Sequence, residues 1–317
     1  MYTILANDGI DASCKKILAG AGIEVIEKKI AQEILAVELK KFDGIIVRSA
    51  TKVTGDIIKA ASHLKFIARA GVGLDNIDTG AAKQAGITVI NTPGASSHSV
   101  AELVFAHLFG LVRSLHDSNR QMPLEGEKNF AGLKKKYSGG TELKGKTLGI
   151  IGLGRIGQAV AKIALGIGMK VIAHDPFVTE AVVEIEISGV PHNVVIKINT
   201  VPMEEALKKS DFITLHIPGS KSPVITSKEI GMMKDGAGIV NAARGGVVSE
   251  SDLLDAIRKG KIAYAGLDVF ENEPAPSLNI LMEPNLSLTP HIGAATAEAQ
   301  ERIGIELGEK IVAFLKK

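Results

Sequence analysis

The chain has 317 residues, 45% of them apolar and 23% charged, which is enough for two domains that each bury a core. Its 37 basic and 35 acidic side chains give a formal net charge of +2, so no global field is offered to nucleic acid or to an anionic membrane. The only cysteine, Cys14, excludes an internal disulfide and a multi-cysteine metal site. No leader-like run opens the chain and no apolar segment approaches about 18 residues, so we expect a cytoplasmic enzyme or binding protein.

Short β-branched runs alternate with helical stretches over the first 93 residues. The expected strands lie in YTILA, IEVIE, GIIVRS, KFIARAG and ITVINT, and the expected helices cover residues 11–20, 31–41, 54–61 and 78–85. Apolar strands that alternate with helices are typical of a parallel sheet covered on both faces. We therefore predict a doubly wound, flavodoxin-like domain.

A second series of the same kind follows a helix that opens near SSHSVAEL. Its strands are expected in KTLGIIG, KVIAHD, FITLHI, AGIVNAA, AYAGLDVF and LSLTPH. Residues 182–201 break the pattern with two alternating runs about GVPHN, which predicts a β-hairpin. The last helix, expected over 295–316, carries an apolar stripe that we expect to return to the first domain. The prediction is an α/β protein with a discontinuous domain, residues 1–97 plus 291–317, and a Rossmann domain over 98–290.

The spacing Gly152, Gly154 and Gly157 matches G-x-G-x-x-G between an apolar strand and a helix. In this motif the first glycine permits a tight turn, the second lets a pyrophosphate approach the backbone, and the third allows close helix packing. Asp175 ends the next strand, where a carboxylate accepts the ribose hydroxyls and repels a 2′-phosphate. The sequence therefore predicts NAD as the cofactor, with Arg155 near the pyrophosphate.

Polar residues follow three later strands: Arg244, then Asp268 and Glu273, then His291. We expect these strand ends to meet at the edge where the nicotinamide binds. Arg244 suits a substrate carboxylate, His291 suits transfer of a hydroxyl proton, and Glu273 suits orientation of the imidazole. Spacing alone leaves Glu271 as a competitor of Glu273. His98, His107 and His116 recur at intervals of nine residues, share no helix face and suggest no metal site.

These motifs resemble the D-2-hydroxyacid dehydrogenase family. The similarity is carried by GLGRIG, NAARGGVV, GLDVFENEP and TPHIGAAT, and VRSATKVT, RAGVGLDNID and NTPGASSHSVAEL resemble its D-3-phosphoglycerate dehydrogenase branch. The resemblance implies catalytic roles for Arg244, Glu273 and His291, and it settles Glu273 over Glu271. The cofactor residues that it implies are Gly152, Gly154, Arg155, Ile156, Gly157, Asp175, His216, Pro218, Ala242, Arg244, Asp268, His291 and Ala294.

For the substrate, the resemblance implies contacts with Arg48, Arg69, Val72, Gly73 and Asn76, with Arg48 as the leading phosphate ligand. It also implies a homodimer through the nucleotide domains, in which Lys134, Lys135 and Lys136 are candidates to reach the partner's site. The long-form enzymes add a C-terminal regulatory domain, and this chain ends at Lys317, so we expect no serine feedback by that route.

The expected reaction is NAD-dependent oxidation of D-3-phosphoglycerate to 3-phosphohydroxypyruvate, the entry to serine synthesis. A glyoxylate or hydroxypyruvate reductase, or a D-lactate-type enzyme, keeps the chemistry and changes the substrate. An NAD-sensing corepressor-like protein, in which turnover is incidental, retains the same motifs. We expect a small 2-hydroxy acid as the ligand, with no metal, nucleic acid or membrane partner.

Overall fold

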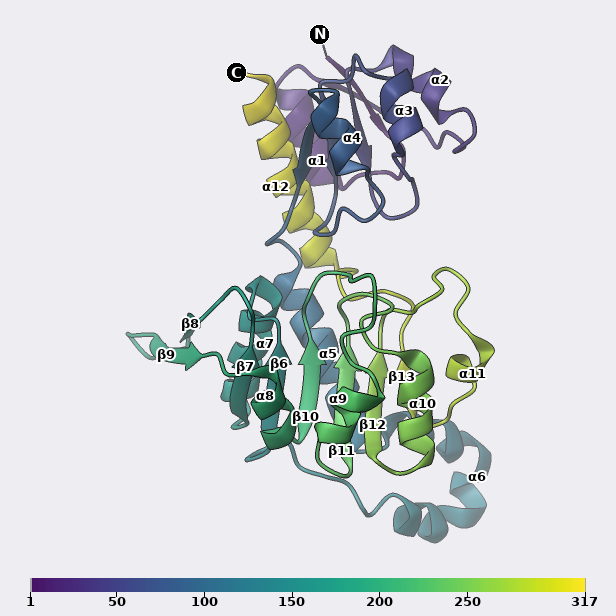
Figure 1. Cartoon of the computed structure of the whole chain (residues 1–317), viewed down its shortest axis with the longest axis vertical. Helices are drawn as coiled ribbons and strands as arrows, with labels where there is room; N and C mark the ends of the chain where they lie inside the picture. Colours follow the sequence, from purple (N-terminus) through teal and green to yellow (C-terminus); the bar gives the residue numbers. More distant parts are fainter. Residues whose placement is uncertain (1, 317) are drawn as a thin grey trace. The chain divides into compact units, whose positions relative to one another are not determined.

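The computed structural model describes residues 2–316, which form two compact units (Figure 1). The first unit runs through Ser97 and includes the residues from Ala294 onward, and the second runs from His98 to Gly293. The expected domain boundary at residue 291 lies three residues before this observed one.

Five parallel strands form the sheet of the first unit, in the order β2-β1-β3-β4-β5. They are Thr3–Ala6 (β1), Glu24–Glu27 (β2), Gly44–Val47 (β3), Phe66–Arg69 (β4) and Thr88–Asn91 (β5). The strand order reverses between β1 and β3, and such a switch point is where open α/β sheets bind ligands.

The helices of this unit are Ala12–Gly20 (α1), Leu35–Glu38 (α2) with a 3₁₀ turn at Leu39–Lys41, Gly55–Ala60 (α3), Thr79–Gln84 (α4) and Ala297–Leu315 (α12). Asp11 caps α1 and Thr296 caps α12 through their side chains. The last helix packs along α1, and Leu307 and Ile311 on it are fully buried beside Cys14 (Figure 1). Gly308 of α12 allows this close packing, because a Cβ there would lie 3.1 Å from Ile17.

Six parallel strands form the main sheet of the second unit, in the order β13-β12-β11-β10-β6-β7. They are Thr147–Ile151 (β6), Lys170–His174 (β7), Phe212–Leu215 (β10), Ala237–Asn241 (β11), Ile262–Leu267 (β12) and Leu286–Leu288 (β13). Two apolar clusters, one on each face, cover these strands. The prediction of two parallel-sheet α/β domains is confirmed.

The helices of the second unit are Ser97–Val112 (α5), Leu115–Lys136 (α6), Arg155–Gly166 (α7), Met203–Lys209 (α8), Ser227–Met232 (α9), Glu250–Arg258 (α10) and Leu278–Leu281 (α11). A capping box between Thr226 and Glu229 opens α9, and Ser249 caps α10. No helix within residues 2–316 has the length and apolar character needed to cross a bilayer.

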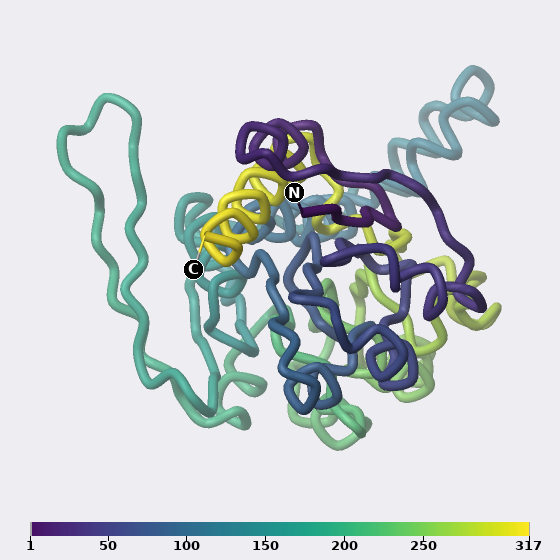
Figure 2. The backbone as a smooth tube through the Cα atoms, turned by 90° about the horizontal axis from the view of Figure 1, so that it is seen from above, coloured from purple at the N-terminus to yellow at the C-terminus, as the bar shows by residue number. Residues whose placement is uncertain are grey.

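A β-hairpin stands away from the sheet of the second unit (Figure 2). Its antiparallel strands are Glu180–Ile185 (β8) and Val194–Asn199 (β9), and residues 186–193 connect them. Ala181, Val183 and Ile198 are buried in the cluster that includes α7, whereas Val182 and Val195 are exposed. The hairpin therefore attaches to the second unit along one face only, and it begins at Glu180, five residues after Asp175.

Candidate active site

The ends of three neighbouring strands bring the expected catalytic residues to one edge of the sheet. Asn241 at the end of β11 pairs in register with Leu267 of β12, and Leu267 pairs with Leu288 of β13. Arg244, Asp268 and His291 follow these three positions within three residues. Parallel strands with aligned ends therefore deliver an arginine, a carboxylate and an imidazole to the same edge.

Glu273 and His291 form an ion-pair geometry, in which His291 Nδ1 lies 2.8 Å from Glu273 Oε2. The other oxygen of Glu273 accepts a hydrogen bond from the Phe270 amide at 2.9 Å, which fixes the orientation of the carboxylate. Glu271 points elsewhere, because its Oε1 accepts from the Glu250 amide at 3.0 Å. The carboxylate thus occupies Nδ1, so Nε2 is the nitrogen of the imidazole that could accept a substrate proton.

The backbone of His291 is left-handed, with φ of 54°, a conformation that costs a non-glycine residue roughly 1–2 kcal/mol. Asp268 holds the turn in which this strain is stored. Its Oδ1 accepts from the Ile292 amide and its Oδ2 accepts from the Gly293 amide, each at 2.8 Å. Asp268 is therefore a buried anchor of the turn, in addition to its expected place beside the cofactor.

Arg244 follows β11 in a tight turn. Asn241 Nδ2 donates to the Arg244 carbonyl at 2.9 Å, and Arg244 Nη1 donates to the Ala243 carbonyl at 2.7 Å. The next residue must be glycine, because a Cβ on Gly245 would collide with the Phe270 carbonyl oxygen. The guanidinium is thereby fixed at the strand edge as a half-buried cation, suited to a carboxylate.

The glycine loop has the geometry that a bound pyrophosphate requires. Gly152 has φ of 99°, and a Cβ there would lie 2.5 Å from the His216 carbonyl oxygen. A Cβ on Gly157 would collide with the Gly152 carbonyl oxygen, so this glycine is needed for packing. A Cβ on Gly154 would meet no protein atom within 4 Å, so the backbone at the start of α7 stands open. These residues fit a dinucleotide.

Two polar side chains flank this loop. Asp175 accepts from the Leu153 amide at 2.8 Å, and from the amides of Phe177 and Val178, so the carboxylate ties the loop to the end of β7. His216 follows β10, and its Nε2 lies 3.0 Å from Thr214 Oγ1. Its Nδ1 is enclosed without a protein partner, and burial lowers the pKa of His216 to about 3.

In the first unit, Arg48 follows β3 and Asp8 follows β1, so the two residues face each other at the switch point. Asp8 Oδ2 accepts from the Arg48 amide at 2.8 Å, and Asn76 Nδ2 donates to the Arg48 carbonyl at 2.7 Å. Burial raises the pKa of Asp8, but hydrogen bonds from Lys29, Thr51 and the backbone of Arg48 and Thr51 outweigh it and hold the pKa below its ordinary value.

A cavity of about 550 Å³ opens at the same edge of the first unit, lined by Ala6, Asn7, Asp8, Gly9, Glu27, Lys28, Lys29, Arg48, Ser49 and Ala50. The Arg48 guanidinium donates through Nη2 to Gln300 Oε1 at 2.6 Å. The expected phosphate ligand therefore lies at a hollow whose lining carries three cations and two carboxylates.

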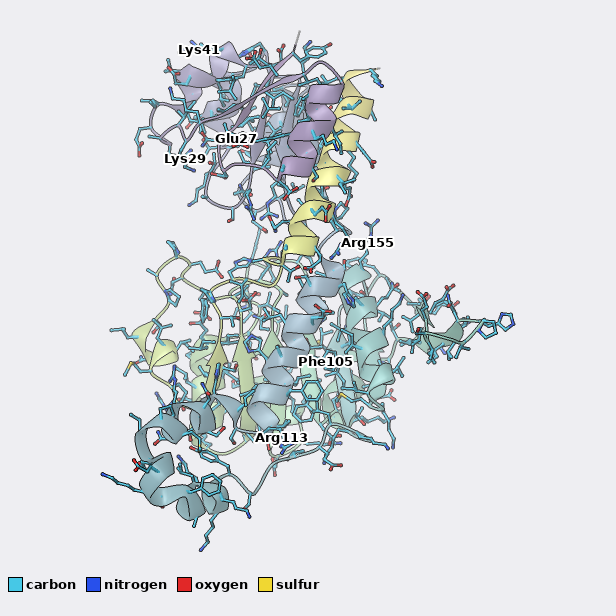
Figure 3. All side chains as sticks on the ribbon, turned by 180° about the vertical axis from the view of Figure 1, so that it is seen from behind. Glu27, Lys29, Lys41, Phe105, Arg113 and Arg155 are labelled. Carbon is cyan, nitrogen blue, oxygen red and sulfur yellow. The ribbon has the colours of Figure 1, made fainter. Side chains whose placement is uncertain are left out.

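The remaining expected cofactor and substrate residues lie at strand ends, at the start of α7 or in the loops that follow. Arg155 is the first residue of α7 and exposed (Figure 3). Val72 accepts through its carbonyl from Asn91 Nδ2 at 2.7 Å, and Gly73 follows it. Arg69 ends β4 beside Gly71. Ile156 is half-buried, Ala242 is buried, Pro218 is exposed, and Ala294 lies in the first unit.

Sequence reasoning missed the residues that support these groups. Asp8 carries no motif of its own and is marked only by its position two residues after strand β1. Thr289 directly follows β13 and is the first residue of TPHIGAAT, but no role for it followed from that motif. Among residues 2–316, no group of three or more histidine, cysteine or acidic side chains is arranged to hold a metal ion.

The chain matches the family of D-isomer specific 2-hydroxyacid dehydrogenases, by its NAD-binding domain, over residues 105–293. It is 45% identical over 316 residues to a hydroxypyruvate reductase of Thermotoga maritima, covering 98% of this chain and 97% of that protein. It is 40% identical over 316 residues to the D-3-phosphoglycerate dehydrogenase of Homo sapiens, covering 99% of this chain and 56% of the relative.

The crystal structure of NAD⁺-bound 3-phosphoglycerate dehydrogenase from Entamoeba histolytica superimposes with a TM-score of 0.78 at 32% identity, over 100% of this chain and 96% of that one. The chain spans slightly more than half the length of the D-3-phosphoglycerate dehydrogenase relatives that it matches in Homo sapiens and Methanocaldococcus jannaschii. The predictions of NAD as cofactor and of this family are confirmed. The chain belongs to the NAD-dependent D-isomer specific 2-hydroxyacid dehydrogenases.

Proposed function

We propose that the chain oxidises D-3-phosphoglycerate to 3-phosphohydroxypyruvate, the first step of serine synthesis. The observation that carries the chemistry is the contact of 2.8 Å between Glu273 and His291 at the strand edge that also holds Arg244. A 2-hydroxy acid has a carboxylate for the arginine and a hydroxyl proton for the imidazole.

In the proposed reaction, bound NAD⁺ supplies the acceptor for the hydride that leaves C2. His291 Nε2 takes the hydroxyl proton, and the carboxylate of Glu273 stabilises the imidazolium that results. Arg244 holds the substrate carboxylate and polarises the C2 oxygen. The products are the 2-keto acid, NADH and one proton, and the reverse reaction uses the same groups.

The charge at the switch point of the first unit supports a phosphorylated substrate. Glu27 is the last residue of β2, Lys29 follows two residues later, and both line the cavity there (Figure 3). Glu27 pairs with Lys15 at 2.6 Å and Asp8 pairs with Lys29 at 2.5 Å, so each lining carboxylate has a lysine partner. Lys28 and Arg48 then add positive charge to the lining, which favours a phosphate over an uncharged hydroxymethyl group.

A second candidate is a hydroxypyruvate reductase that acts on the unphosphorylated acid. The similarity to the Thermotoga maritima hydroxypyruvate reductase favours it, because that match covers 97% of the relative at 45% identity. The two candidates share the catalytic groups and differ in what the first unit must recognise.

The experiment follows NADH absorbance with purified protein and D-3-phosphoglycerate, D-glycerate and D-lactate, and in reverse with 3-phosphohydroxypyruvate, hydroxypyruvate and glyoxylate. Charge-assisted hydrogen bonds contribute about 1.5–3 kcal/mol. We therefore expect Arg48→Gln to lower kcat/KM for phosphoglycerate by roughly 10- to 100-fold and to leave the glycerate reaction within about threefold. Lys40→Gln, an exposed charge of the same unit, is the matched control. Turnover of glycerate without turnover of phosphoglycerate would assign the chain to the second candidate.

We also propose that the protein is cytoplasmic and forms a homodimer through its second unit. Three large apolar side chains of α6, Leu115, Leu124 and Phe130, are more than half exposed, at 61%, 76% and 60%. Lys136 pairs with Asp117 at 2.8 Å on the same helix, which leaves Lys134 and Lys135 as the better candidates to reach a partner. Light scattering of Leu124→Glu against Lys128→Glu tests the interface: only the first is expected to give a monomer.

A further inference from the structure

A buried chain of hydrogen bonds leads from α5 to the turn that carries His291. Ser287 Oγ lies 2.8 Å from His107 Nδ1, and His107 Nε2 lies 3.1 Å from Thr289 Oγ1. The Thr289 hydroxyl donates to Asp268 Oδ1 at 2.6 Å. His107, Asp268 and Ser287 are 2%, 1% and 6% exposed, so water does not satisfy these polar groups.

The direction of each hydrogen bond follows from the acceptor at its end. An ionised carboxylate only accepts, so the single hydroxyl proton of Thr289 points to Asp268. Thr289 Oγ1 must then accept from His107, which places the imidazole proton on Nε2. The Nδ1 atom is left as an acceptor for the Ser287 hydroxyl. The hydrogen bonds are therefore all donated in the same direction, from Ser287 to His107, from His107 to Thr289 and from Thr289 to Asp268.

Asp268 is where this chain meets the active-site turn. Its two oxygens accept three donors, the Thr289 hydroxyl and the amides of Ile292 and Gly293, which surround His291 in sequence. Ser99, also on α5, donates to the Gly293 carbonyl at 2.7 Å. Gly293 packs closely on this carboxylate, since a Cβ there would lie 3.1 Å from Asp268 Oδ2 and would require a small shift of one of the two. The left-handed backbone of His291 thus depends on the position of one carboxylate.

We infer that His107 is a positioning residue for catalysis, which acts through Thr289 and Asp268 to hold the strained turn of His291. The imidazole of His107 forms no hydrogen bond with Glu273 or His291. It orients the hydroxyl of Thr289, and this hydroxyl in turn donates to Asp268 Oδ1. The close fit of His107 against β12 serves the same end, because a Cβ on Gly266 would lie 3.0 Å from the ring.

This inference rests on the proposed proton transfer by His291, and its tests are separate from that role. A displacement of a catalytic group by about 1 Å can cost roughly 100-fold in rate. We expect Thr289→Val to lower kcat by about 10- to 100-fold with the KM of the hydroxy acid within threefold, and Thr289→Ser, which keeps the hydroxyl, to stay within threefold of wild type. If both variants kept the wild-type kcat while His291→Ala lost activity, the inferred role of these hydrogen bonds would be wrong and the proposed function would stand.

A double-variant cycle tests His107 itself. His107→Phe is expected to lower kcat by about tenfold in the wild-type background and by less than twofold in Thr289→Val, because both changes break the same chain. His107→Gln keeps a donor toward Thr289 and is expected to recover most of the loss. His192→Phe, an exposed histidine at the hairpin tip, is the matched control. Additive losses, or losses that follow the melting temperature alone, would overturn the inference.

A third measurement needs no variant to fold, because it examines the wild-type protein. Long-range ¹⁵N–¹H spectra of ¹⁵N-histidine-labelled protein distinguish the two neutral tautomers. Burial lowers the pKa of His107, Asp268 acts to raise it and His116 to lower it, and the net shift is downward. We expect a neutral His107 at pH 7.5, above the ordinary imidazole pKa of about 6.5, with its proton on Nε2. A proton on Nδ1, or a doubly protonated ring at that pH, would contradict the chain's direction.

Discussion

Glu273, and not Glu271, lies against His291: Oε2 of Glu273 is 2.8 Å from Nδ1 of the imidazole, whereas Glu271 accepts from the backbone of Glu250. The two glutamates are two residues apart in one turn, and only one of them meets the histidine. This relationship separates the proposed catalytic carboxylate, Glu273, from Glu271, which only bonds the backbone, and makes the two glutamates a matched test.

Glu273→Gln is expected to lower kcat by at least about 10-fold, since general acid–base groups contribute roughly 10²- to 10⁴-fold and the amide cannot stabilise an imidazolium. Steady-state oxidation of the hydroxy acid measures this loss. Glu271→Gln keeps an oxygen for the Glu250 amide and is expected to stay within about twofold of wild type. Equal losses in the two variants would mean that the turn, and not the carboxylate, is what matters.

Two glycines of the nucleotide loop, Gly154 and Gly157, are expected to respond differently to alanine. Gly154→Ala adds a Cβ where no protein atom lies within 4 Å, so the melting temperature should hold while the dissociation constant of NADH rises at least about tenfold. Gly157→Ala collides with the Gly152 carbonyl oxygen and should lower the melting temperature itself. NADH titration and thermal unfolding measure both, with Gly166→Ala at the end of α7 as control. Unchanged NADH binding in Gly154→Ala would show that the dinucleotide does not approach there.

Removal of the Asp175 carboxylate is expected to weaken the preference for NADH over NADPH by at least about tenfold, because like charges placed together cost a few kcal/mol. The same change removes the acceptor of the Leu153 amide, so NADH itself should bind more weakly. The ratio of kcat/KM for the two cofactors measures the effect in Asp175→Ala. Glu180→Ala, an exposed carboxylate of the hairpin, should leave that ratio unchanged.

The stability of the cofactor-free protein should fall as pH drops through the range set by His216, whose pKa burial lowers to about 3. The unfolded chain takes up a proton on this group near pH 6.5, and the folded protein does not until about pH 3, so acid favours unfolding in between. Between pH 7 and pH 5 this difference in proton uptake lowers the free energy of unfolding by about 2 kcal/mol. His216→Gln should lose that much less stability over the same range in urea unfolding. An identical loss in both proteins would argue against an imidazole that stays neutral in the folded protein.

The sequence predicted the two sheets because their strands are continuous apolar runs. It pointed to the candidate site because Arg244, Asp268 and His291 each follow such a run within three residues. It did not predict α6, where Pro123 and Gly132 interrupt the helical pattern and much of the apolar surface faces outward. It also gave no sign that His107 contacts the turn of His291. His107 meets Ser287 from 180 residues away, and no local pattern records a contact across that separation.

We propose that His291 carries the substrate proton and that the second unit binds NAD without it. The chain contains no tryptophan, so the fluorescence of bound NADH can be titrated against a low protein background. We predict that His291→Ala keeps the dissociation constant of NADH within about threefold and lowers the single-turnover rate of hydroxy-acid oxidation by at least about 100-fold. A variant that binds NADH normally and oxidises the hydroxy acid at the wild-type rate would contradict this prediction.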